Sequence, residues 1–200
     1  RYDVVDLSID SVEDFFNQIT EATPEYIGLS MMSLDINRHY GLAMEIKKHF
    51  PCIKIIAGGA HISFVREKAL RDCSAIDFGI VHEGEHTLVE LLNGNLFHNI
   101  KGLLYREQDG TVIYTGNRDL IDDLDQLPFP RYRNFRLSRY GQTLAIASSR
   151  GCPFSCTFCG AFLSMGRKWR ARSVENIVAE LEYWQQKGYT SFNFIDSNFF

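Results

Sequence analysis

Residues 144–159 read LAIASSRGCPFSCTFC, an apolar, strand-like run that leads into three cysteines at positions 152, 156 and 159. Three thiolates this close together on one loop can hold three irons of a four-iron cluster and leave the fourth iron open to a substrate or cofactor. A structural zinc site needs four protein ligands, and neither cysteine nor histidine follows Cys159. The spacing therefore favours an iron–sulfur cluster over zinc.

The residues after the cysteines predict the opening of a (βα) barrel. Ser173 is a favourable helix N-cap, apolar residues then recur at helical spacing until Gly188, and residues 189–195 have the pattern of a strand. Strand, cysteine loop, helix and strand, in this order, are the first elements of such a barrel. The apolar helix positions are Val174, Ile177, Val178, Leu181 and Trp184.

The string SSRGCPFSCTFCGAF at 148–162 resembles the cluster loop of the radical S-adenosylmethionine (radical SAM) enzymes, whose signature is CxxxCxΦC with an aromatic residue at Φ. The resemblance implies that Cys152, Cys156 and Cys159 are catalytic metal ligands of a four-iron, four-sulfur cluster, and that Phe158 lies beside the adenine of S-adenosylmethionine. Electron transfer to the sulfonium of that cofactor would then give a 5′-deoxyadenosyl radical. The resemblance also implies anaerobic chemistry on a small-molecule substrate, with an electron donor such as flavodoxin or ferredoxin.

Asp196 ends the second strand of the expected barrel, where radical SAM enzymes meet the amino group of the cofactor. Many of them carry Gly-Gly-Glu at this place, whereas Asp196-Ser197 is similar to an acidic variant found in one subgroup. The resemblance therefore assigns Asp196 to the cofactor ammonium, although a capping aspartate at a strand end explains the same residue. Either Arg170 or Arg172 is expected near the cofactor carboxylate.

Upstream, residues 1–100 alternate strand-like and helix-like segments, which predicts a flavodoxin-like, doubly wound α/β domain. Expected strands cover 2–7, 26–32, 53–59 and 76–81, with one helix capped by Ser11 and others around 42–50, 64–70 and 87–92. Ligands of such sheets bind at the carboxyl ends of the strands. The loops at those ends are therefore the candidate binding residues.

These loops resemble the cobalamin-binding domain that precedes the barrel in one radical SAM subgroup, similar to the anaerobic magnesium-protoporphyrin cyclase-type proteins. There a serine-rich turn, a Gly-Gly and a GEGE-like loop surround cobalamin, and ordinary turns of an α/β domain are the alternative explanation. The DxHxxG motif that ligates cobalt is absent, and because residues 2–7 match the second strand of such domains better than the first, we expect the first strand to be missing. His61, His82 and His86 are not assigned as ligands. The matching residues are Ser30, Ser33, Gly58, Gly59, Glu83, Gly84 and Glu85.

The expected organisation is an α/β domain at 1–100, a β-hairpin and proline-containing linker at 101–135, and the N-terminal part of a radical SAM barrel at 136–200. Because the chain starts with Arg1 and stops inside an apolar run, we expect a fragment with a truncated barrel. A net charge of −4 argues against a nucleic-acid partner. Five cysteines without a leader or a long apolar stretch predict a cytoplasmic protein with no membrane segment.

The sequence thus predicts a radical SAM enzyme that uses cobalamin for methyl transfer to, or oxidative cyclisation or rearrangement of, an unactivated carbon. A radical SAM enzyme without cobalamin is the first alternative. A tRNA methylthiotransferase is the second, but it needs three more cysteines in the first domain, where only Cys52 and Cys73 are present. A cobalamin carrier would have a degenerate barrel, which the intact cysteine motif disfavours.

Overall fold

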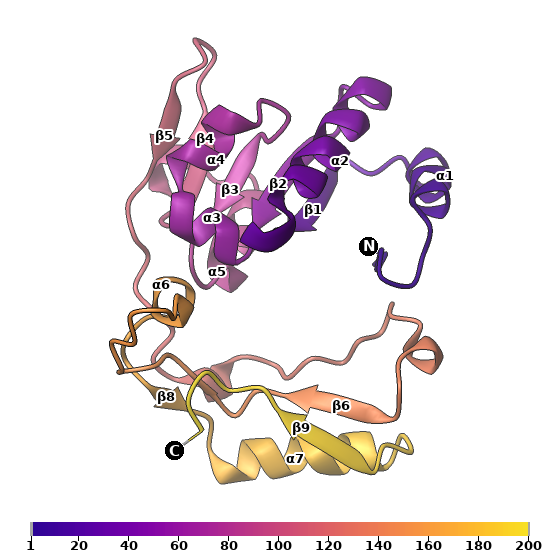
Figure 1. Cartoon of the computed structure of the whole chain (residues 1–200), viewed down its shortest axis with the longest axis vertical. Helices are drawn as coiled ribbons and strands as arrows, with labels where there is room; N and C mark the ends of the chain where they lie inside the picture. Colours follow the sequence, from indigo (N-terminus) through magenta and orange to yellow (C-terminus); the bar gives the residue numbers. More distant parts are fainter. Residues whose placement is uncertain (1, 200) are drawn as a thin grey trace. The chain divides into compact units, whose positions relative to one another are not determined.

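The computed structural model describes residues 2–199, which form two compact units (Figure 1). The first, here called the sheet unit, contains residues 23–120 and 158–166. The second, the cluster-loop unit, contains 2–22, 121–157 and 167–199. The loop with the three cysteines therefore begins in the cluster-loop unit and ends in the sheet unit.

The sheet unit is built on a five-stranded sheet in the order β1-β2-β3-β4-β5. The first three strands are parallel, as expected for an α/β domain, and β4 and β5 add an antiparallel hairpin. The strands are β1 (Tyr26–Ser30), β2 (Lys54–Gly58), β3 (Phe78–Ile80), β4 (Leu103–Arg106) and β5 (Val112–Tyr114). The helices are η1 (Ser33–Asp35), α2 (Ile36–His49), α3 (Ala60–Val65), α4 (Glu67–Asp72), α5 (Glu85–Leu92), η2 (Phe97–Asn99) and α6 (Ala161–Met165).

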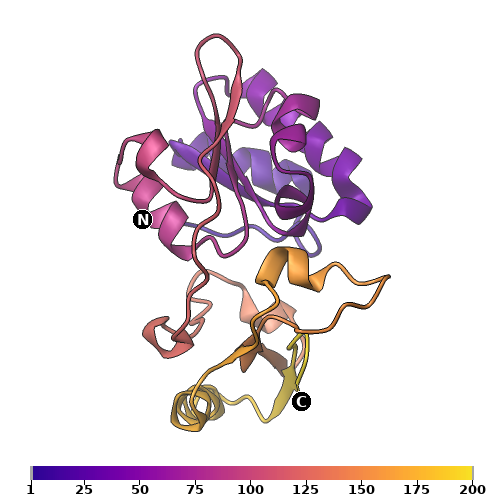
Figure 2. The same ribbon diagram turned by 90° about the vertical axis from the view of Figure 1, so that its left-hand side faces the viewer.

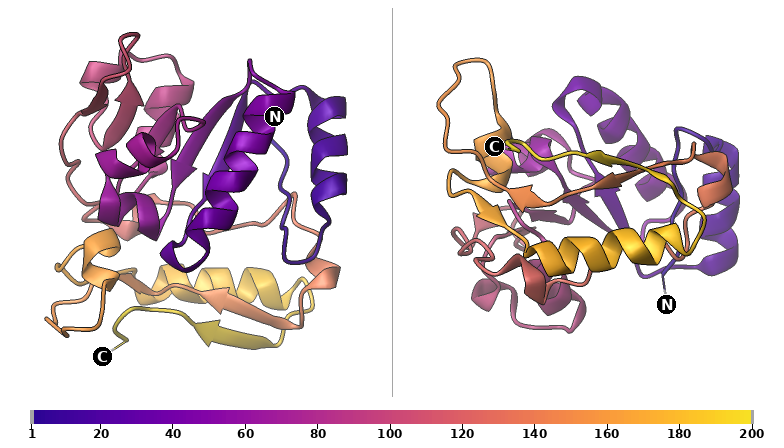
Figure 3. Two further views of the ribbon diagram at one scale, coloured as in Figure 1. Left: turned by 45° about the horizontal axis from the view of Figure 1, so that its top comes forward. Right: turned by 90° about the horizontal axis from the view of Figure 1, so that it is seen from below.

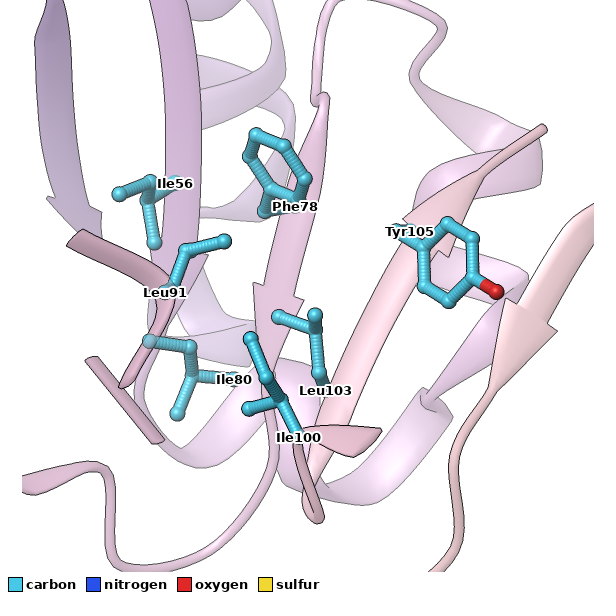
Figure 4. Close-up of a cluster of buried hydrophobic side chains, with 7 residues drawn as sticks. All are labelled: Ile56, Phe78, Ile80, Leu91, Ile100, Leu103 and Tyr105. Carbon is cyan, nitrogen blue, oxygen red and sulfur yellow. The ribbon is translucent and has the colours of Figure 1, made fainter. Parts of the chain in front are cut away.

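Helices cover both faces of this sheet. Successive side chains of a strand point to opposite faces, so each strand can pack against helices on both sides. Leu91 of α5 packs on the face that carries Phe78 and Ile80 (Figure 4). Gly79 faces the other way, where a Cβ atom would lie 3.1 Å from Leu70 Cδ1 of α4. Leu103 is completely buried in the cluster that contains Leu91, Phe78 and Ile80, so Leu103→Ala should lower the free energy of unfolding by about 2–5 kcal/mol.

The hairpin forms around the expected Asp109-Gly110 turn, with Glu107 N donating to Thr111 O at 2.8 Å. Its place differs from the sequence-based expectation of a connection between two domains. β4 pairs with β3, and Leu104 lies opposite Gly79, so the hairpin completes the sheet. Figure 2 shows its turn projecting beyond the neighbouring strands.

The cluster-loop unit contains the expected strand, loop, helix and strand. β6 (Thr143–Ile146) pairs in parallel with β9 (Ser191–Phe194), and α7 (Val174–Gln185) runs alongside both (Figure 3). The buried Trp184 of α7 packs with Leu144 and Ile146 of β6. The remaining elements are α1 (Val12–Ala22), η3 (Leu124–Gln126), η4 (Leu137–Arg139), β7 (Ser149–Arg150) and β8 (Arg170–Ala171), the last two forming an antiparallel pair.

The strand expected at 2–7 is wrong, because these residues form no regular structure. Their polar groups instead bond within the cluster-loop unit. The Tyr140 hydroxyl donates to Asp6 Oδ2 at 2.6 Å, and the buried Asp10 carboxylate accepts from Arg136 and Arg139 at 2.9 and 3.0 Å. Side-chain partners more than a hundred residues away thus decide the structure of this segment.

Within residues 2–199, no helix combines the length and apolar character needed to cross a bilayer. The boundaries near 100 and 135 stay predictions, since the two units are groups of packed residues and the first includes part of the cysteine loop.

Candidate functional site

The cysteine loop spans residues 151–160, between β7 and α6, and has no regular backbone structure. Its three thiols are not in disulfides, with Cys152 half-buried and Cys156 and Cys159 exposed. Arg167 Nη1 holds the loop by donating to Phe154 O at 3.1 Å and to Ser155 Oγ at 3.0 Å. Among residues 2–199 no three His, Cys, Asp or Glu side chains are already gathered as a metal site. Three free thiols on one irregular loop are nevertheless the donor set that an iron–sulfur cluster takes.

Asp196 lies just after β9 and bonds directly to the base of the cysteine loop. Its Oδ1 accepts from Ser149 Oγ at 2.6 Å, from Ser148 Oγ at 3.0 Å, and from the Ser149 backbone amide. Its Oδ2 is buried and has no hydrogen-bond partner among the described residues. The carboxylate is thus held by one oxygen, while the other can accept a hydrogen bond from a bound group.

The arginines after the loop are already engaged by the protein. Arg172 donates to Glu180 Oε2 at 2.5 Å, to Ala147 O at 2.9 Å and to Asn176 Oδ1 at 2.8 Å. Arg170 is buried and donates to Ile121 O at 2.6 Å. These contacts give both arginines roles within the fold, and the expected contact of one of them with a cofactor carboxylate stays a prediction.

In the sheet unit, the two glycines after β2 have different surroundings. A Cβ atom on Gly58 would meet no atom within 4 Å, so this position faces open space. Gly59 has φ +94°, and a Cβ there would lie 2.8 Å from Met31 O. Gly59 is thus required by its contact with the end of β1, where Ser30 is exposed, whereas Gly58 leaves room for a ligand.

Ser33 belongs to a chain of hydrogen bonds with His61 and Tyr40, which the sequence did not predict. Its hydroxyl lies 3.0 Å from His61 Nδ1, and His61 Nε2 lies 3.0 Å from the Tyr40 hydroxyl. Burial lowers the pKa of His61 and raises that of Tyr40 to about 12. The neutral imidazole therefore has one donor and one acceptor nitrogen, and its tautomer sets how the Ser33 hydroxyl points.

The residues Glu83, Gly84 and Glu85 form the turn between β3 and α5. Glu83 is buried, Glu85 is the first residue of α5, and a Cβ on Gly84 would lie 3.0 Å from Ile80 Cγ2. Before them, His82 has φ +63° and its amide donates to Ser63 Oγ at 2.9 Å. The turn is therefore tied to α3, which carries Ser63.

The two other thiols do not form a second cluster site within residues 2–199. Cys52 is exposed, whereas Cys73 is buried and its pKa is raised by that burial. A thiol held protonated is a poor metal ligand.

Comparison with known proteins agrees with this geometry. Residues 1–92 match the model of the B12 binding domain family. The chain is 31% identical, over 93% of its length, to an uncharacterized methyltransferase of Pyrococcus horikoshii, of which it covers 42%. It is 28% identical, over 88% of its length, to the anaerobic magnesium-protoporphyrin IX monomethyl ester cyclase of Rubrivivax gelatinosus, of which it covers 33%.

The fold is also that of a solved radical SAM enzyme. The methyltransferase TsrM from Kitasatospora setae, solved with tryptophan substrate and a SAM analogue, matches 98% of this chain with a TM-score of 0.80 at 19% identity. This chain covers 42% of TsrM. The chain is therefore similar to the B12-binding-domain radical SAM proteins, as its sequence indicated.

The chain has the mixed α/β fold expected from its sequence. The chain spans less than half the length of the relatives named above. The B12-binding match also covers residues 2–22, which in the structure pack within the cluster-loop unit.

Proposed function

We propose that this chain is the cofactor-binding part of a cobalamin-dependent radical SAM enzyme. Cys152, Cys156 and Cys159 would hold a four-iron, four-sulfur cluster with one iron open to S-adenosylmethionine, and Phe158 would flank the adenine. Phe158 is 91% exposed, so its ring is available for stacking. Ser30, Ser33, Gly58, Gly59, Glu83, Gly84 and Glu85 would surround cobalamin.

The observation that carries the proposal is the different environment of the two carboxylate oxygens of Asp196. Three donors from Ser148 and Ser149 fix Oδ1. The carboxylate is therefore bonded to a residue that lies only three positions before Cys152, the first cysteine of the loop. The buried, unpartnered Oδ2 is then available to accept from the ammonium of S-adenosylmethionine, a charge-assisted bond. A structural cap at a strand end needs only the first of these features.

The carboxyl edge of the sheet supports the cobalamin half of the proposal. Gly58 faces open space, and on the loop after β1 the side chains of Met32 and Leu34 are 55% and 93% exposed. Exposed apolar groups beside an open glycine suit a large, flat, mostly apolar ligand. The hydroxyls of Ser30, at the end of β1, and Ser33, at the start of η1, would supply polar contacts.

When bound, the cluster would supply the electron for cleavage of the sulfonium, and cobalamin a methyl carrier. The chain's own residues bind and orient these groups: the thiols ligate iron, Asp196 holds the ammonium, and the sheet edge holds the corrin. Proteins similar in sequence include methyltransferases and a cyclase, so both methyl transfer and oxidative cyclisation fit the proposal. A structure of TsrM with cobalamin and a four-iron cluster bound has the same fold, with a TM-score of 0.71.

The two halves of the proposal can be tested separately on the whole chain. After anaerobic reconstitution, we expect about four irons per chain, which the variant Cys152→Ala/Cys156→Ala/Cys159→Ala should lose while the control Cys52→Ala keeps them. Hydroxocobalamin should bind and change its visible spectrum. Gly58→Leu should abolish this binding by filling the open space, whereas Gly41→Leu, which also has no atom within 4 Å of its Cβ position, should not.

Equal iron in the triple variant would contradict the cluster assignment. Equal cobalamin binding in Gly58→Leu and the Gly41→Leu control would contradict the assignment of cobalamin to this edge.

A further inference from the structure

The short helix α3 follows the Gly58-Gly59 turn directly and contacts α6, the helix after the cysteine loop. It begins at Ala60, directly after the Gly58-Gly59 turn, and carries Phe64 one residue before its end. α6, which follows the cysteine loop, packs against α3 within the sheet unit. One end of α3 therefore borders the proposed cobalamin edge, and the other end meets the chain that leaves the third cysteine.

The contact between these segments is made by Gly160 and the ring of Phe64. A Cβ atom on Gly160 would lie 2.7 Å from Phe64 Cζ and 3.1 Å from Cε2, well inside normal contact distance. Gly160 has φ −101°, which any residue adopts, so its backbone alone does not require glycine. The aromatic ring is what excludes a side chain at this position.

The other end of α6 is held in a similar way. Gly166 lies so close to Leu120 Cδ1 that a Cβ atom would overlap it. α6 is thus bracketed by two glycines, each against an apolar side chain of the sheet unit. Because Cys159 immediately precedes Gly160, and Phe158 precedes Cys159, the packing of Gly160 restricts where both can lie.

We propose that Phe64 is a positioning residue for the cluster loop. By seating Gly160, it fixes the place of Cys159 and Phe158 relative to the Gly58-Gly59 turn at the start of the same helix. This inference rests on the proposed function, since it assigns Phe64 a purpose only if Cys159 binds a cluster and Phe158 a cofactor. Phe64 touches neither group itself and acts through Gly160.

A pair of compensating substitutions tests the contact. Gly160→Ala adds a methyl group that the ring must displace, whereas Phe64→Leu removes the ring atoms Cε1, Cε2 and Cζ that the methyl group would meet. Because the added methyl group would move Cys159 and Phe158 with Gly160, Gly160→Ala should raise the concentration of S-adenosylmethionine needed for half of the spectral change by about tenfold, which corresponds to about 1.4 kcal/mol of binding free energy. Phe64→Leu alone should also weaken the response, because the ring then no longer holds Gly160 in place, and the double variant should return to within about threefold of Phe64→Leu.

The measurement is the electron paramagnetic resonance (EPR) spectrum of the reduced, reconstituted chain during titration with S-adenosylmethionine, with hydroxocobalamin binding as a check of the sheet unit. Gly141→Ala is the matched control, because it adds the same methyl group where no atom lies within 4 Å. If Gly160→Ala fails to fold, recovery of folding and of the response in the double variant supports the same contact.

A response of Phe64→Leu or of Gly160→Ala equal to wild type, or a double variant no better than Gly160→Ala, would overturn the role of Phe64. A wild-type chain that holds no cluster or shows no response would instead overturn the proposed function.

Discussion

Arg172 and Glu180 form a buried ion pair, with Nη1 and Oε2 2.5 Å apart and side chains only 10% and 2% exposed. The same guanidinium donates to Ala147 O, just after β6, and to the Asn176 side chain on α7. The pair therefore fastens α7 to the strand that leads into the cysteine loop. This pair gives Arg172 a structural task within the cluster-loop unit.

Removing one partner of this pair should destabilise the protein strongly. Glu180→Ala leaves the Arg172 charge buried without its carboxylate, which typically costs about 3–5 kcal/mol. Chemical denaturation of the variant should show this loss in the free energy of unfolding. Glu182→Ala, at an exposed position two residues further along α7, should stay within about 0.5 kcal/mol of wild type. Equal stabilities of the two variants would contradict the importance of the pair.

His61 should make the stability of the sheet unit fall in mild acid. Its pKa is lowered from 6.5 by burial, so the unfolded chain takes up this proton at a higher pH than the folded chain. The stabilising contribution of neutral His61 is therefore complete above 6.5 and decreases as the pH falls below it. His61→Gln should show a shallower decrease between neutral pH and about pH 5, measured by urea denaturation.

His98→Gln, at an exposed position in η2, provides the comparison for this effect. A pH dependence of stability that is the same in wild type, His98→Gln and His61→Gln would show that His61 does not titrate in this way.

Tyr140 should make the stability of the cluster-loop unit fall as the pH rises in the alkaline range. Its hydrogen bond to Asp6 raises the pKa of the phenol from 10.0 to about 12 and lowers that of Asp6. Since the unfolded chain loses the phenolic proton first, this contribution is complete below pH 10 and is lost as the pH rises towards 12. Tyr140→Phe should lack that part of the alkaline loss, whereas Tyr2→Phe, which removes an exposed phenol, should not. A phenol of Tyr140 that titrates near 10 by its ultraviolet absorbance would contradict the contact.

The variant Asp196→Asn should separate the structural role of Oδ1 from the proposed cofactor-binding role of Oδ2. The remaining carbonyl oxygen can keep accepting from Ser148 and Ser149, but the second oxygen becomes an NH₂ donor and repels an ammonium. We expect unchanged iron content and an affinity for S-adenosylmethionine reduced about ten- to hundredfold, the range of a lost charge-assisted hydrogen bond. Ser148→Ala, which removes only one donor to Oδ1, should weaken binding much less. An affinity unchanged in Asp196→Asn would leave the aspartate as a strand-end cap.

The N-cap at Ser173 and the positions of the strands after residue 25 could be predicted because each depends on a local pattern of residues. Ser173 Oγ accepts from Asn176 N at 3.1 Å, a contact that lies within four residues. The failure at residues 2–7 has a different cause, since Asp6 is held by Tyr140, a partner that no local pattern reveals.

The candidate site shows the same division. The glycine pair was predicted as one feature, yet Gly58 faces open space and Gly59 contacts Met31, a difference set by the fold of the loop after β1. The link from Asp196 to Ser149 and the contact of Gly160 with Phe64 join residues far apart in sequence, so they became visible only in the structure.

The central claim is that the cysteine loop leaves one iron open to S-adenosylmethionine. Its most direct test is the EPR spectrum of the anaerobically reconstituted and reduced chain before and after that compound is added. We predict a shift in the g values of the cluster, because the amino and carboxylate groups of the compound would change the coordination of one iron. An unchanged spectrum at saturating concentration would contradict the account.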